Sequence, residues 1–361
     1  MTPLVDGSEP IPPLTGRERM LRALQVREVD ATPVWFMRQA GRSLPEYRAL
    51  RERHDFMQIA TTPELAVQAT MMPVDRLGVD AAVLFADIML PLAGMGVPFE
   101  ITPGAGPVIP NPIRTKADID RLRVGDPEES TPYVLETLRL LRGELGTRTA
   151  LLGFAGAPFT LACYLVEGRA SRDFPRAKAL MYGEPELWNR LMAVLTETTI
   201  RYLRAQAVAG ADAVQLFDSW LGLVPPDFYD PKVHPHTSRI FGELRGIVPT
   251  IHFSTCTASL LSHIASSGCD AVSIDWRVRI DDAWTRLRST QAIQGNLDPT
   301  LLLIDPEGAL DEVARLLLLV AGRPGHIFNL GHGVLPETDP DLLKRVVELV
   351  HAWDFSAQNI D

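Results

Sequence analysis

Residues 210–218 have the sequence Gly-Ala-Asp-Ala-Val-Gln-Leu-Phe-Asp, and this stretch decides the fold class. Gly210 is typical of a residue that ends a helix in a left-handed conformation. The short apolar run after it is typical of a strand buried on both faces of a parallel sheet. The same pattern, Gly-Cys-Asp-Ala-Val-Ser-Ile-Asp, occupies residues 268–275. Each stretch predicts the end of a helix, then a buried strand, then an acidic residue at the strand end.

Similar apolar runs recur along the chain, and segments with helical spacing separate them. Thr15-Gly16-Arg17-Glu18 forms a capping box, which predicts that the first helix begins at Thr15. Apolar stripes at 187, 191, 194 and 195 and at 310, 313, 317 and 320 predict two later helices. The eight predicted strands are Val34–Met37, Ala81–Ala86, Ala150–Phe154, Ala213–Phe217, Thr250–Phe253, Ala271–Ile274, Ala292–Ile293 and His326–Leu330.

Eight strands that alternate with helices over about 300 residues predict an α/β fold, a single (β/α)8 TIM barrel. A doubly wound open sheet is the alternative, but no glycine-rich nucleotide motif follows the first predicted strand. The proline-rich segment Val97–Asn111 predicts an inserted loop or a short hairpin. Residues 1–14 are predicted to be a flexible or extended lead-in because four prolines, Asp6 and Glu9 lie within residues 1–13. Residues 15–361 are predicted to form the barrel domain.

Composition argues against several classes of partner. The net charge is −10 and the basic residues are scattered, whereas a nucleic-acid-binding protein normally carries a basic stripe. No apolar run approaches the roughly 18 residues that a membrane span needs, and the first residues lack the pattern of a signal peptide. The three cysteines, Cys163, Cys256 and Cys269, are too few and too scattered for a disulfide framework. We therefore expect a cytoplasmic protein.

In a TIM barrel the chemistry lies at the carboxyl ends of the strands. Polar or conformationally special residues follow nearly every predicted strand. For Ser254, Asp275 and Asp298 we expect helix capping or turn formation rather than a functional role. The full set is Arg38, Asp87, Gly156, Asp218, Ser219, Ser254, Asp275, Asn296, Asp298 and His332.

Arg38 and Arg42 lie four residues apart in Arg-Gln-Ala-Gly-Arg, directly after the first predicted strand. Arginine keeps its charge near neutral pH and presents a donor fork that fits carboxylates and phosphates. The pair indicates either a pocket for a polyanionic small molecule or two solvated loop arginines. Asp87 interrupts the apolar stretch Phe-Ala-Asp-Ile-Met-Leu of residues 85–90, where an unpaired charge is costly. It is expected to face a cation, either a structural arginine or a ligand that carries or develops positive charge.

Two further residues have open interpretations. His332 lies between glycines in Leu-Gly-His-Gly, which fits either a phosphate site or a neutral imidazole that donates or accepts a hydrogen bond in the pocket mouth. Tyr164 is predicted to lie on the helix that follows Gly156-Ala157-Pro158. Its hydroxyl either faces the barrel mouth or belongs to an ordinary core tyrosine.

The sequence offers no convincing metal or cofactor site. His234-Pro235-His236 fits a surface loop or a helix start, and the pair His252 and Cys256 has no third ligand nearby in sequence. There is no glycine-rich nucleotide loop, and the lysines fall in polar, helical or loop stretches, so no Schiff-base lysine is evident. We therefore expect neither a metal nor an organic cofactor.

Taken together, the strand-end motifs resemble those of uroporphyrinogen decarboxylases. The resemblance spans roughly residues 15 to 352 and keeps the motifs in order; Arg-Gln-Ala-Gly-Arg is its most specific block. The motifs are Pro-Val-Trp-Phe-Met-Arg-Gln-Ala-Gly-Arg at 33–42, Leu-Pro-Glu-Tyr-Arg at 44–48, Phe-Ala-Asp-Ile at 85–88, Gly-Ala-Pro-Phe-Thr at 156–160, Phe-Asp-Ser-Trp at 217–220, Gly-Asn-Leu-Asp-Pro at 295–299 and Leu-Gly-His-Gly at 330–333.

The resemblance implies a cofactor-free cytoplasmic homodimer of TIM barrels that acts in haem and chlorophyll biosynthesis. Its reaction removes the four acetate carboxyl groups of uroporphyrinogen III, an anionic tetrapyrrole, and yields coproporphyrinogen III. By the resemblance, Asp87 is the catalytic carboxylate under the macrocycle, and Arg38 binds substrate, with a second role as acid left open. The substrate-binding residues that it implies are Arg38, Gln39, Ala40, Gly41, Arg42, Asp87, Tyr164, Ser219 and His332.

Two alternatives remain open at the level of sequence. One is a zinc-dependent corrinoid or thiol methyltransferase of the same superfamily, and the other is a non-catalytic tetrapyrrole-binding protein.

The chain departs from the resembled pattern at Ser43, where an aromatic residue is usual, at Phe159, where tryptophan is common, and at Thr255-Cys256. The last departure lies close to the expected substrate contacts.

Overall fold

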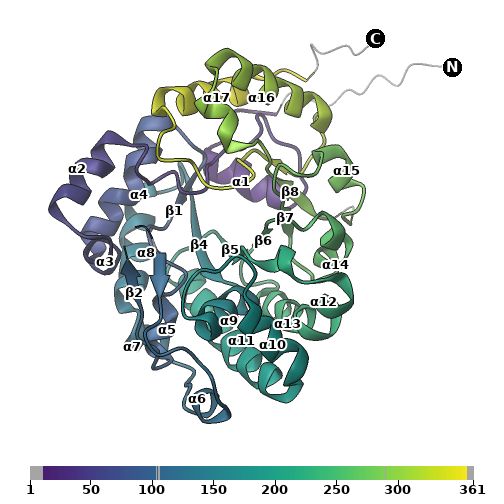
Figure 1. The fold of residues 1–361 in the computed structure, drawn as a ribbon. Coiled ribbons are helices and arrows are strands. Elements are labelled where there is room, and N and C mark those ends of the chain that lie inside the picture. The colour runs from purple at the N-terminus through teal and green to yellow at the C-terminus, as the bar shows by residue number, and fades with distance from the viewer. Residues whose placement is uncertain (1–10, 103, 105, 289, 356–361) are drawn as a thin grey trace.

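The protein is described by a computed structural model that covers residues 11–102, 104, 106–288 and 290–355. Within these residues, seven parallel strands form one sheet in the order β1-β4-β5-β6-β7-β8-β9, and helices surround it (Figure 1). A doubly wound sheet would reverse its strand order partway, whereas here every neighbour follows in chain order. The strands are β1 Ala81–Val83, β4 Ala150–Gly156, β5 Ala213–Asp218, β6 Thr250–Ser254, β7 Ala271–Ser273, β8 Ala292–Gln294 and β9 His326–Ile327.

The prediction of a strand at Val34–Met37 is wrong, although this segment lies where the barrel closes. Val34 makes an isolated parallel bridge with Phe328 beyond β9. On its other side, the Val34 carbonyl accepts a hydrogen bond from the Asp80 N–H, just before β1, at 2.8 Å. The ladder does not continue because the Met37 N–H donates to the Asn329 side chain at 3.1 Å. The ring is therefore completed by one bridge and side-chain amides, and the predicted barrel is confirmed.

The predicted helix signals are also confirmed. The side chain of Thr15 accepts from the Glu18 N–H, and Glu18 bonds back to the Thr15 N–H at 2.9 Å, so the helix begins where the capping box predicts. The segment Val97–Asn111 contains an antiparallel hairpin, β2 Glu100–Thr102 with β3 Gly106–Val108. The helices are α1 Gly16–Leu24, α2 Pro45–Arg53, α3 Phe56–Thr61, α4 Pro63–Leu77, α5 Leu90–Gly94, α6 Lys116–Asp120, α7 Pro127–Ser130, α8 Pro132–Leu145, α9 Pro158–Glu167, α10 Pro175–Gly183, α11 Pro185–Val208, α12 Pro226–Lys232, α13 His234–Leu244, α14 Leu261–Ser266, α15 Ile280–Trp284, α16 Pro306–Val320 and α17 Pro340–Ala352.

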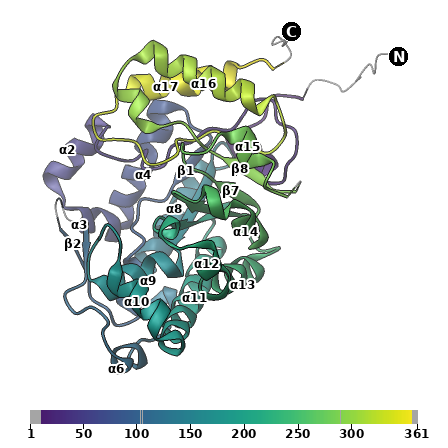
Figure 2. The ribbon, with the colours of Figure 1, turned by 45° about the vertical axis from the view of Figure 1, so that its right-hand side comes forward.

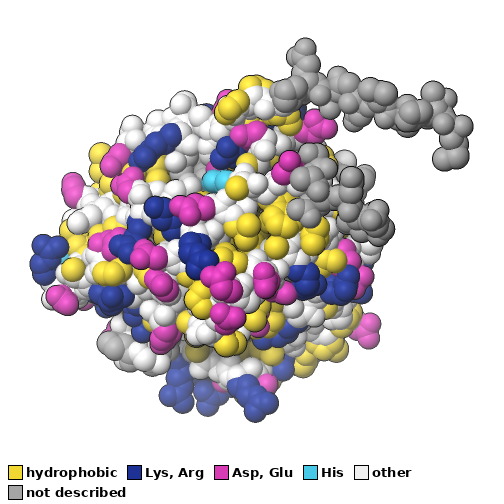
Figure 3. All heavy atoms as spheres, turned by 90° about the horizontal axis from the view of Figure 1, so that it is seen from above, with side chains coloured by type: hydrophobic (Ala, Val, Ile, Leu, Met, Phe, Trp, Pro, Cys, Tyr) yellow, Lys and Arg dark blue, Asp and Glu magenta, His cyan; other side chains and the backbone are white. Residues whose placement is uncertain are grey.

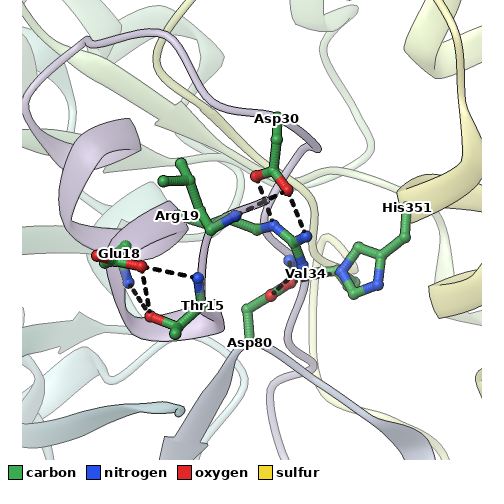
Figure 4. A network of polar contacts seen from close by, with 8 residues as sticks. Thr15, Glu18, Arg19, Asp30, Val34, Asp80 and His351 are labelled. Atoms are coloured by element: carbon green, nitrogen blue, oxygen red, sulfur yellow. Dashed lines mark hydrogen bonds and ion pairs between the residues drawn. The ribbon is translucent and has the colours of Figure 1, made fainter. Parts of the chain in front are cut away.

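A buried ionic network ties the first and last helices to the amino-terminal end of the barrel (Figure 4). Asp80 is 2% exposed, and its Oδ2 accepts from the Val34 N–H at 2.8 Å and lies 2.7 Å from Nε2 of His351 on α17. Arg19 on α1 lies 3.2 Å from Asp80 Oδ1 and donates two hydrogen bonds to Asp30. Because buried charges need partners, this network locks the end of the barrel opposite the expected site.

The core is continuous through the barrel. One hydrophobic cluster runs from Met20 to Val350, and a smaller one packs Phe85 against α2, α3 and α4. Figure 2, a view turned by 45° from that of Figure 1, also shows the helices around the sheet. The predicted lead-in falls mainly on residues 1–10, which lie outside the described residues, while the Leu14 N–H already donates to Asp30 Oδ2 at 3.1 Å. We propose that residues from 15 onward form a single unit.

Acidic and basic side chains are intermingled across the face that Figure 3 shows. None of the helices that the structure describes is long and apolar enough to cross a membrane.

Candidate active site

The Arg38 loop is held in a specific conformation at the carboxyl end of the barrel. Arg38 has φ 61°, a left-handed conformation that costs a residue with a Cβ about 1–2 kcal/mol. A Cβ on Gly41 would lie 2.7 Å from the Arg38 carbonyl oxygen, and a Cβ on Gly333 would lie 2.7 Å from Arg38 Cγ and still closer to Cδ. Two glycines thus allow the chain to pack closely around Arg38. Strained conformations of this kind cluster at functional sites.

Gln39 supports this loop from within the core. Its Oε1 accepts from the Phe36 N–H at 3.0 Å, and its Nε2 donates to the carbonyl of Ala81 in β1 at 3.0 Å. Gln39 is 1% exposed, so its amide joins the loop to the sheet and leaves the arginines facing outward. Ala40 and Gly41 complete the turn, and both are partly buried. Sequence reasoning places Gln39 among the substrate contacts, and the observed partners of its amide show that its side chain also positions the loop.

Arg38 and Arg42 are both exposed. Within the described part of the chain, neither guanidinium takes part in a hydrogen bond or an ion pair. The carbonyl of Arg42 accepts from Arg48 Nη1 at 2.8 Å, which steadies the backbone that carries the side chain. Two uncompensated arginines on a fixed loop suit the binding of carboxylates.

Asp87 is partly buried where β1 gives way to α5. Its Oδ1 accepts from the Met89 N–H at 2.8 Å. Among the described residues, no cation lies within ion-pair distance of it. Burial raises the pKa of the Asp87 carboxyl, and the Met89 hydrogen bond and the charge of Arg38 offset part of that rise. Of the two predicted cations, a structural arginine does not form an ion pair with Asp87 within the described residues, although the charge of Arg38 acts on its carboxyl.

His332 lies beside the same loop. Burial, together with the charges of Arg38 and Arg277, lowers the pKa of His332 to about 4, although Asp275 acts in the opposite direction. The imidazole is therefore neutral near pH 7, with one ring nitrogen a donor and the other an acceptor. This favours the neutral-imidazole interpretation of Leu-Gly-His-Gly over a phosphate site.

Tyr164 lies on α9 and is 8% exposed. Burial raises the pKa of its hydroxyl, and the charges of Asp87 and Arg38 also act on it, so the hydroxyl lies near both groups. Its ring packs at 6.2 Å from Phe174 and 6.2 Å from Trp220. Tyr164 is therefore both a core aromatic and a neighbour of the charged groups at the mouth.

Ser219 follows β5 and is partly buried. Its carbonyl accepts from Thr255 Oγ1 at 2.8 Å, which joins the loops after β5 and β6. Thr160 Oγ1 donates to the buried carboxylate of Asp218 at 2.8 Å and accepts from the Trp220 N–H at 3.4 Å. These contacts define the position of the Ser219 backbone at the barrel mouth.

An aromatic ladder, which sequence reasoning missed, crosses neighbouring strands in this region. The ring centroids of Phe154 and Phe217 are 5.3 Å apart, and those of Phe217 and Phe253 are 5.4 Å apart. Phe253 then lies 6.1 Å from the ring of His332. All these pairs have edge-to-face geometry, which suits aromatic rings. The ladder places a run of largely buried aromatic rings beside His332 at this end of the barrel.

The strand-end residues expected to be structural have structural contacts. Asp298 Oδ1 accepts from the Thr300 N–H at 2.9 Å, and Ser254 Oγ lies 2.7 Å from Thr257 Oγ1. Asp275 accepts from the N–H groups of Cys256 and Arg277. These contacts confirm the expected capping and turn roles.

The weak metal signals do not converge. His252 is fully buried and packs against Phe241 at 5.4 Å, while Cys256 is exposed. His234 begins α13, as the helix-start interpretation expected. In the part of the chain that the structure describes, no group of three His, Cys, Asp or Glu side chains could hold a metal ion.

The close approach of Gly333 to Arg38 gives a testable prediction. Gly333→Ala adds a Cβ that overlaps the Arg38 stem, so the guanidinium must move, and we expect turnover to fall roughly tenfold or more, because small misplacements of catalytic groups are costly. Steady-state kinetics measures this loss. Gly143→Ala is the control, since nothing lies within 4 Å of a Cβ at that position. Unchanged kinetics in the Gly333 variant would show that the fit of Arg38 against this loop does not matter.

Comparison with known proteins gives one consistent result. The family model described as uroporphyrinogen decarboxylase (URO-D) matches residues 15–353. Uroporphyrinogen decarboxylase of Sorangium cellulosum is 52% identical over 337 residues, which are 93% of this chain and 96% of that protein. The protein of the same name from Salinispora tropica is 51% identical over 92% of this chain and 89% of its own length. The one from Carboxydothermus hydrogenoformans is 47% identical over 92% of this chain and 96% of its own.

Solved structures agree on the fold. A methyltransferase from Methanosarcina mazei matches 93% of this chain and 98% of its own, with a TM-score of 0.79 and 21% identity. A B12-independent methionine synthase from Shewanella sp. W3-18-1 matches 80% of this chain and 87% of its own, with a TM-score of 0.54 and 11% identity. At these identities the likeness shows a shared fold, and activity has to be argued from the site.

Proposed function

The chain belongs to the uroporphyrinogen decarboxylase family, and we propose that the residues at its barrel mouth carry out the removal of the four acetate carboxyl groups of uroporphyrinogen III. The product is coproporphyrinogen III, and each step exchanges one carboxylate for a proton with release of CO2. The observation that carries the proposal is the Asp87 carboxylate, which has no ion-pair partner in the described residues and lies within the influence of Arg38, on a loop whose two arginines are uncompensated. The methyltransferase alternative is not favoured.

The chemical problem is to provide an electron sink. A neutral pyrrole accepts electrons poorly, so its acetate does not readily lose CO2. Protonation of the adjacent ring carbon produces a cationic ring that accepts the electron pair of the breaking C–C bond. Because the sink then lies in the substrate, a pyridoxal or thiamine cofactor is redundant.

Asp87 has the properties that this intermediate needs. Its carboxylate accepts hydrogen bonds from pyrrole N–H groups and opposes the positive charge that develops in the ring. A fixed charge aimed at a developing charge stabilises the transition state without reorganisation. Burial raises the pKa of the Asp87 carboxyl, and a cationic ring would act as the ion-pair partner that the described residues do not provide.

Arg38 and Arg42 anchor acetate and propionate groups of the substrate. Their donor forks match carboxylates, and the Gln39 amide and Gly41 turn fix the loop from which they project. A guanidinium keeps its proton near neutral pH. Arg38 therefore serves first as an anchor, and any proton that it helps to deliver passes through water.

Tyr164, Ser219 and His332 complete the set of pocket contacts. The neutral imidazole of His332 and the hydroxyl groups of the other two residues offer hydrogen bonds without further charge. Ala40 contributes backbone only, within the turn between the two arginines. These roles are supported by the proximity of Tyr164 and His332 to the Arg38 charge.

The direct test is anaerobic incubation with uroporphyrinogen III, followed by oxidation and chromatography of the porphyrin carboxylates. We expect products with seven, six, five and finally four carboxyl groups. Binding of the porphyrinogen without any loss of carboxyl groups would favour the non-catalytic tetrapyrrole-binding alternative.

A second test concerns cofactors. Because the cationic ring acts as its own electron sink, exhaustive dialysis against a chelator is expected to leave decarboxylation unchanged. Comparison of rates before and after dialysis, with metal content measured in parallel, checks this. An activity that disappears and returns with added zinc would favour the methyltransferase-like alternative and remove the role given to Asp87.

We also propose a cytoplasmic homodimer, in line with the family resemblance. The three cysteines are unpaired, and two of them are buried, which suits a reducing compartment. Light scattering of the purified protein tests the dimer directly.

A further inference from the structure

We infer that Arg277, in the loop after β7, binds a peripheral carboxylate of the substrate from a different side of the barrel mouth than Arg38 and Arg42. The inference rests on the decarboxylase function proposed above and adds a third cationic contact to it. Two strands, β8 and β9, separate β7 from the bridge at Val34 that precedes the Arg38 loop.

The guanidinium of Arg277 is held in place by two neighbours. Its Cζ lies 4.1 Å from the ring centroid of Trp276, a stacked cation–π geometry. Its Nη1 donates to Asp275 Oδ2 at 2.8 Å, and Asp275 is itself 4% exposed. Asp275 also accepts from the Arg277 N–H at 3.0 Å and from the Cys256 N–H at 2.6 Å, so the carboxylate that orients the arginine is fixed.

The fixed arginine still has donors to offer. The Arg277 side chain is 47% exposed. Within the described residues, Nη1 is the side-chain nitrogen of Arg277 that donates a hydrogen bond, which leaves Nε and Nη2 for a ligand. Because a pre-organised fork loses little entropy on binding, such an arginine suits a carboxylate.

Packing places this arginine at the catalytic mouth. A Cβ on Gly331 would lie 2.6 Å from the Trp276 backbone nitrogen, so the glycine lets the His332 loop lie flush against the loop after β7. The charges of Arg277 and Arg38 both act on the His332 ring. The three groups therefore lie near one another at the carboxyl end of the barrel, where the rim of a macrocycle that lies over Asp87 would meet them.

A purely structural role for Arg277 would be to neutralise Asp275. That role uses Nη1 and leaves Nε and Nη2 of the half-exposed side chain without a partner in the described residues. It also does not explain why the charge acts on His332 together with that of Arg38. Arg279 offers a matched comparison in the same loop. Its guanidinium is bound to Asp281 on α15, with Nη2 2.7 Å from Oδ2.

The experiment measures kcat and KM for uroporphyrinogen III in the wild type, in Arg277→Gln and Arg277→Lys, and in Arg279→Gln as the control. Loss of a charge-assisted contact is expected to raise KM about tenfold or more in Arg277→Gln, with kcat nearly unchanged. The KM of Arg277→Lys is expected to lie between the KM values of the wild type and of Arg277→Gln. The difference in KM between the wild type and Arg277→Gln should become smaller as the salt concentration rises, since salt screens interactions between exposed charges.

An unchanged KM in Arg277→Gln, or an equal rise of KM in Arg279→Gln, overturns the inference about Arg277. The proposed decarboxylase function still stands in that case if the wild type turns over uroporphyrinogen III. Failure of the wild type to release CO2 would instead refute the function. If Arg277→Gln does not fold, the KM of Arg277→Lys decides, because lysine can still pair with Asp275.

Discussion

Asp87→Asn is expected to lower turnover of uroporphyrinogen III by roughly 10²–10³ while the protein stays folded, because removal of one pre-organised electrostatic group has effects of this size. The substitution keeps the size of the side chain and an oxygen that can accept from the Met89 N–H. It removes the negative charge that opposes the cationic ring. The loss should therefore appear mainly in kcat, measured anaerobically at saturating substrate.

Stability and pH provide controls for this variant. Burial raises the pKa of Asp87 above its ordinary value of 3.8, so at neutral pH the ionised carboxyl opposes folding. Asp87→Asn removes that cost, and its melting temperature should equal or exceed that of the wild type. In the wild type, kcat/KM should fall as pH drops toward the raised pKa and the carboxylate gains a proton. A folded variant with near wild-type turnover would exclude the mechanism.

Arg42→Lys is expected to raise KM for uroporphyrinogen III by about tenfold or more, although the charge is kept. An ammonium cannot reproduce two parallel hydrogen bonds to one carboxylate. The guanidinium of Arg42 is exposed and lies on a loop whose backbone is steadied by Arg48, so the change should act on binding rather than on the fold. Substrate titration at low and high salt measures it, and affinity should fall as salt rises.

Arg345→Lys is the matched control for Arg42→Lys. Arg345 lies on α17 and pairs with Glu307 on α16 at 2.7 Å, outside the site. It receives the same substitution and should keep the wild-type KM. An Arg42→Lys enzyme with wild-type affinity would assign the Arg-Gln-Ala-Gly-Arg block a structural role.

The barrel was predictable because the buried strands read as local apolar runs, and those at β5 and β7 follow a glycine at the end of a helix and precede an acidic residue. The segment Val34–Met37 was wrongly predicted to be a strand, because its hydrogen-bond partners cannot be read from the local sequence. The Met37 N–H binds the side chain of Asn329, and the Phe36 N–H binds that of Gln39, so side chains replace the expected ladder. Local apolar character does not distinguish a strand from a segment bonded in this way.

The charged part of the site was accessible from sequence, and its apolar part was not. Asp87 and the two arginines stand out as charges next to apolar runs. In strands buried on both faces, by contrast, the sequence does not reveal which residues face the barrel interior. Phe253 joins the aromatic ladder, whereas its neighbour His252 packs against the helix layer at Phe241. Arg277 was missed because a single arginine after a strand resembles any solvated loop residue.

The closure of the ring at Val34 has a consequence for how the molecule assembles. Sequential strand order lets each βα unit dock on the one made before it, so most contacts need only short loop closures. The seam is different, because it joins the Val34 segment to the Phe328 segment across nearly the whole chain and is held by one backbone bridge and a few further hydrogen bonds. Such distant contacts form slowly and late. The seam is therefore expected to form last in folding and to open first by local unfolding in the native state. The Arg38 loop, which must admit a bulky macrocycle, begins four residues beyond Val34.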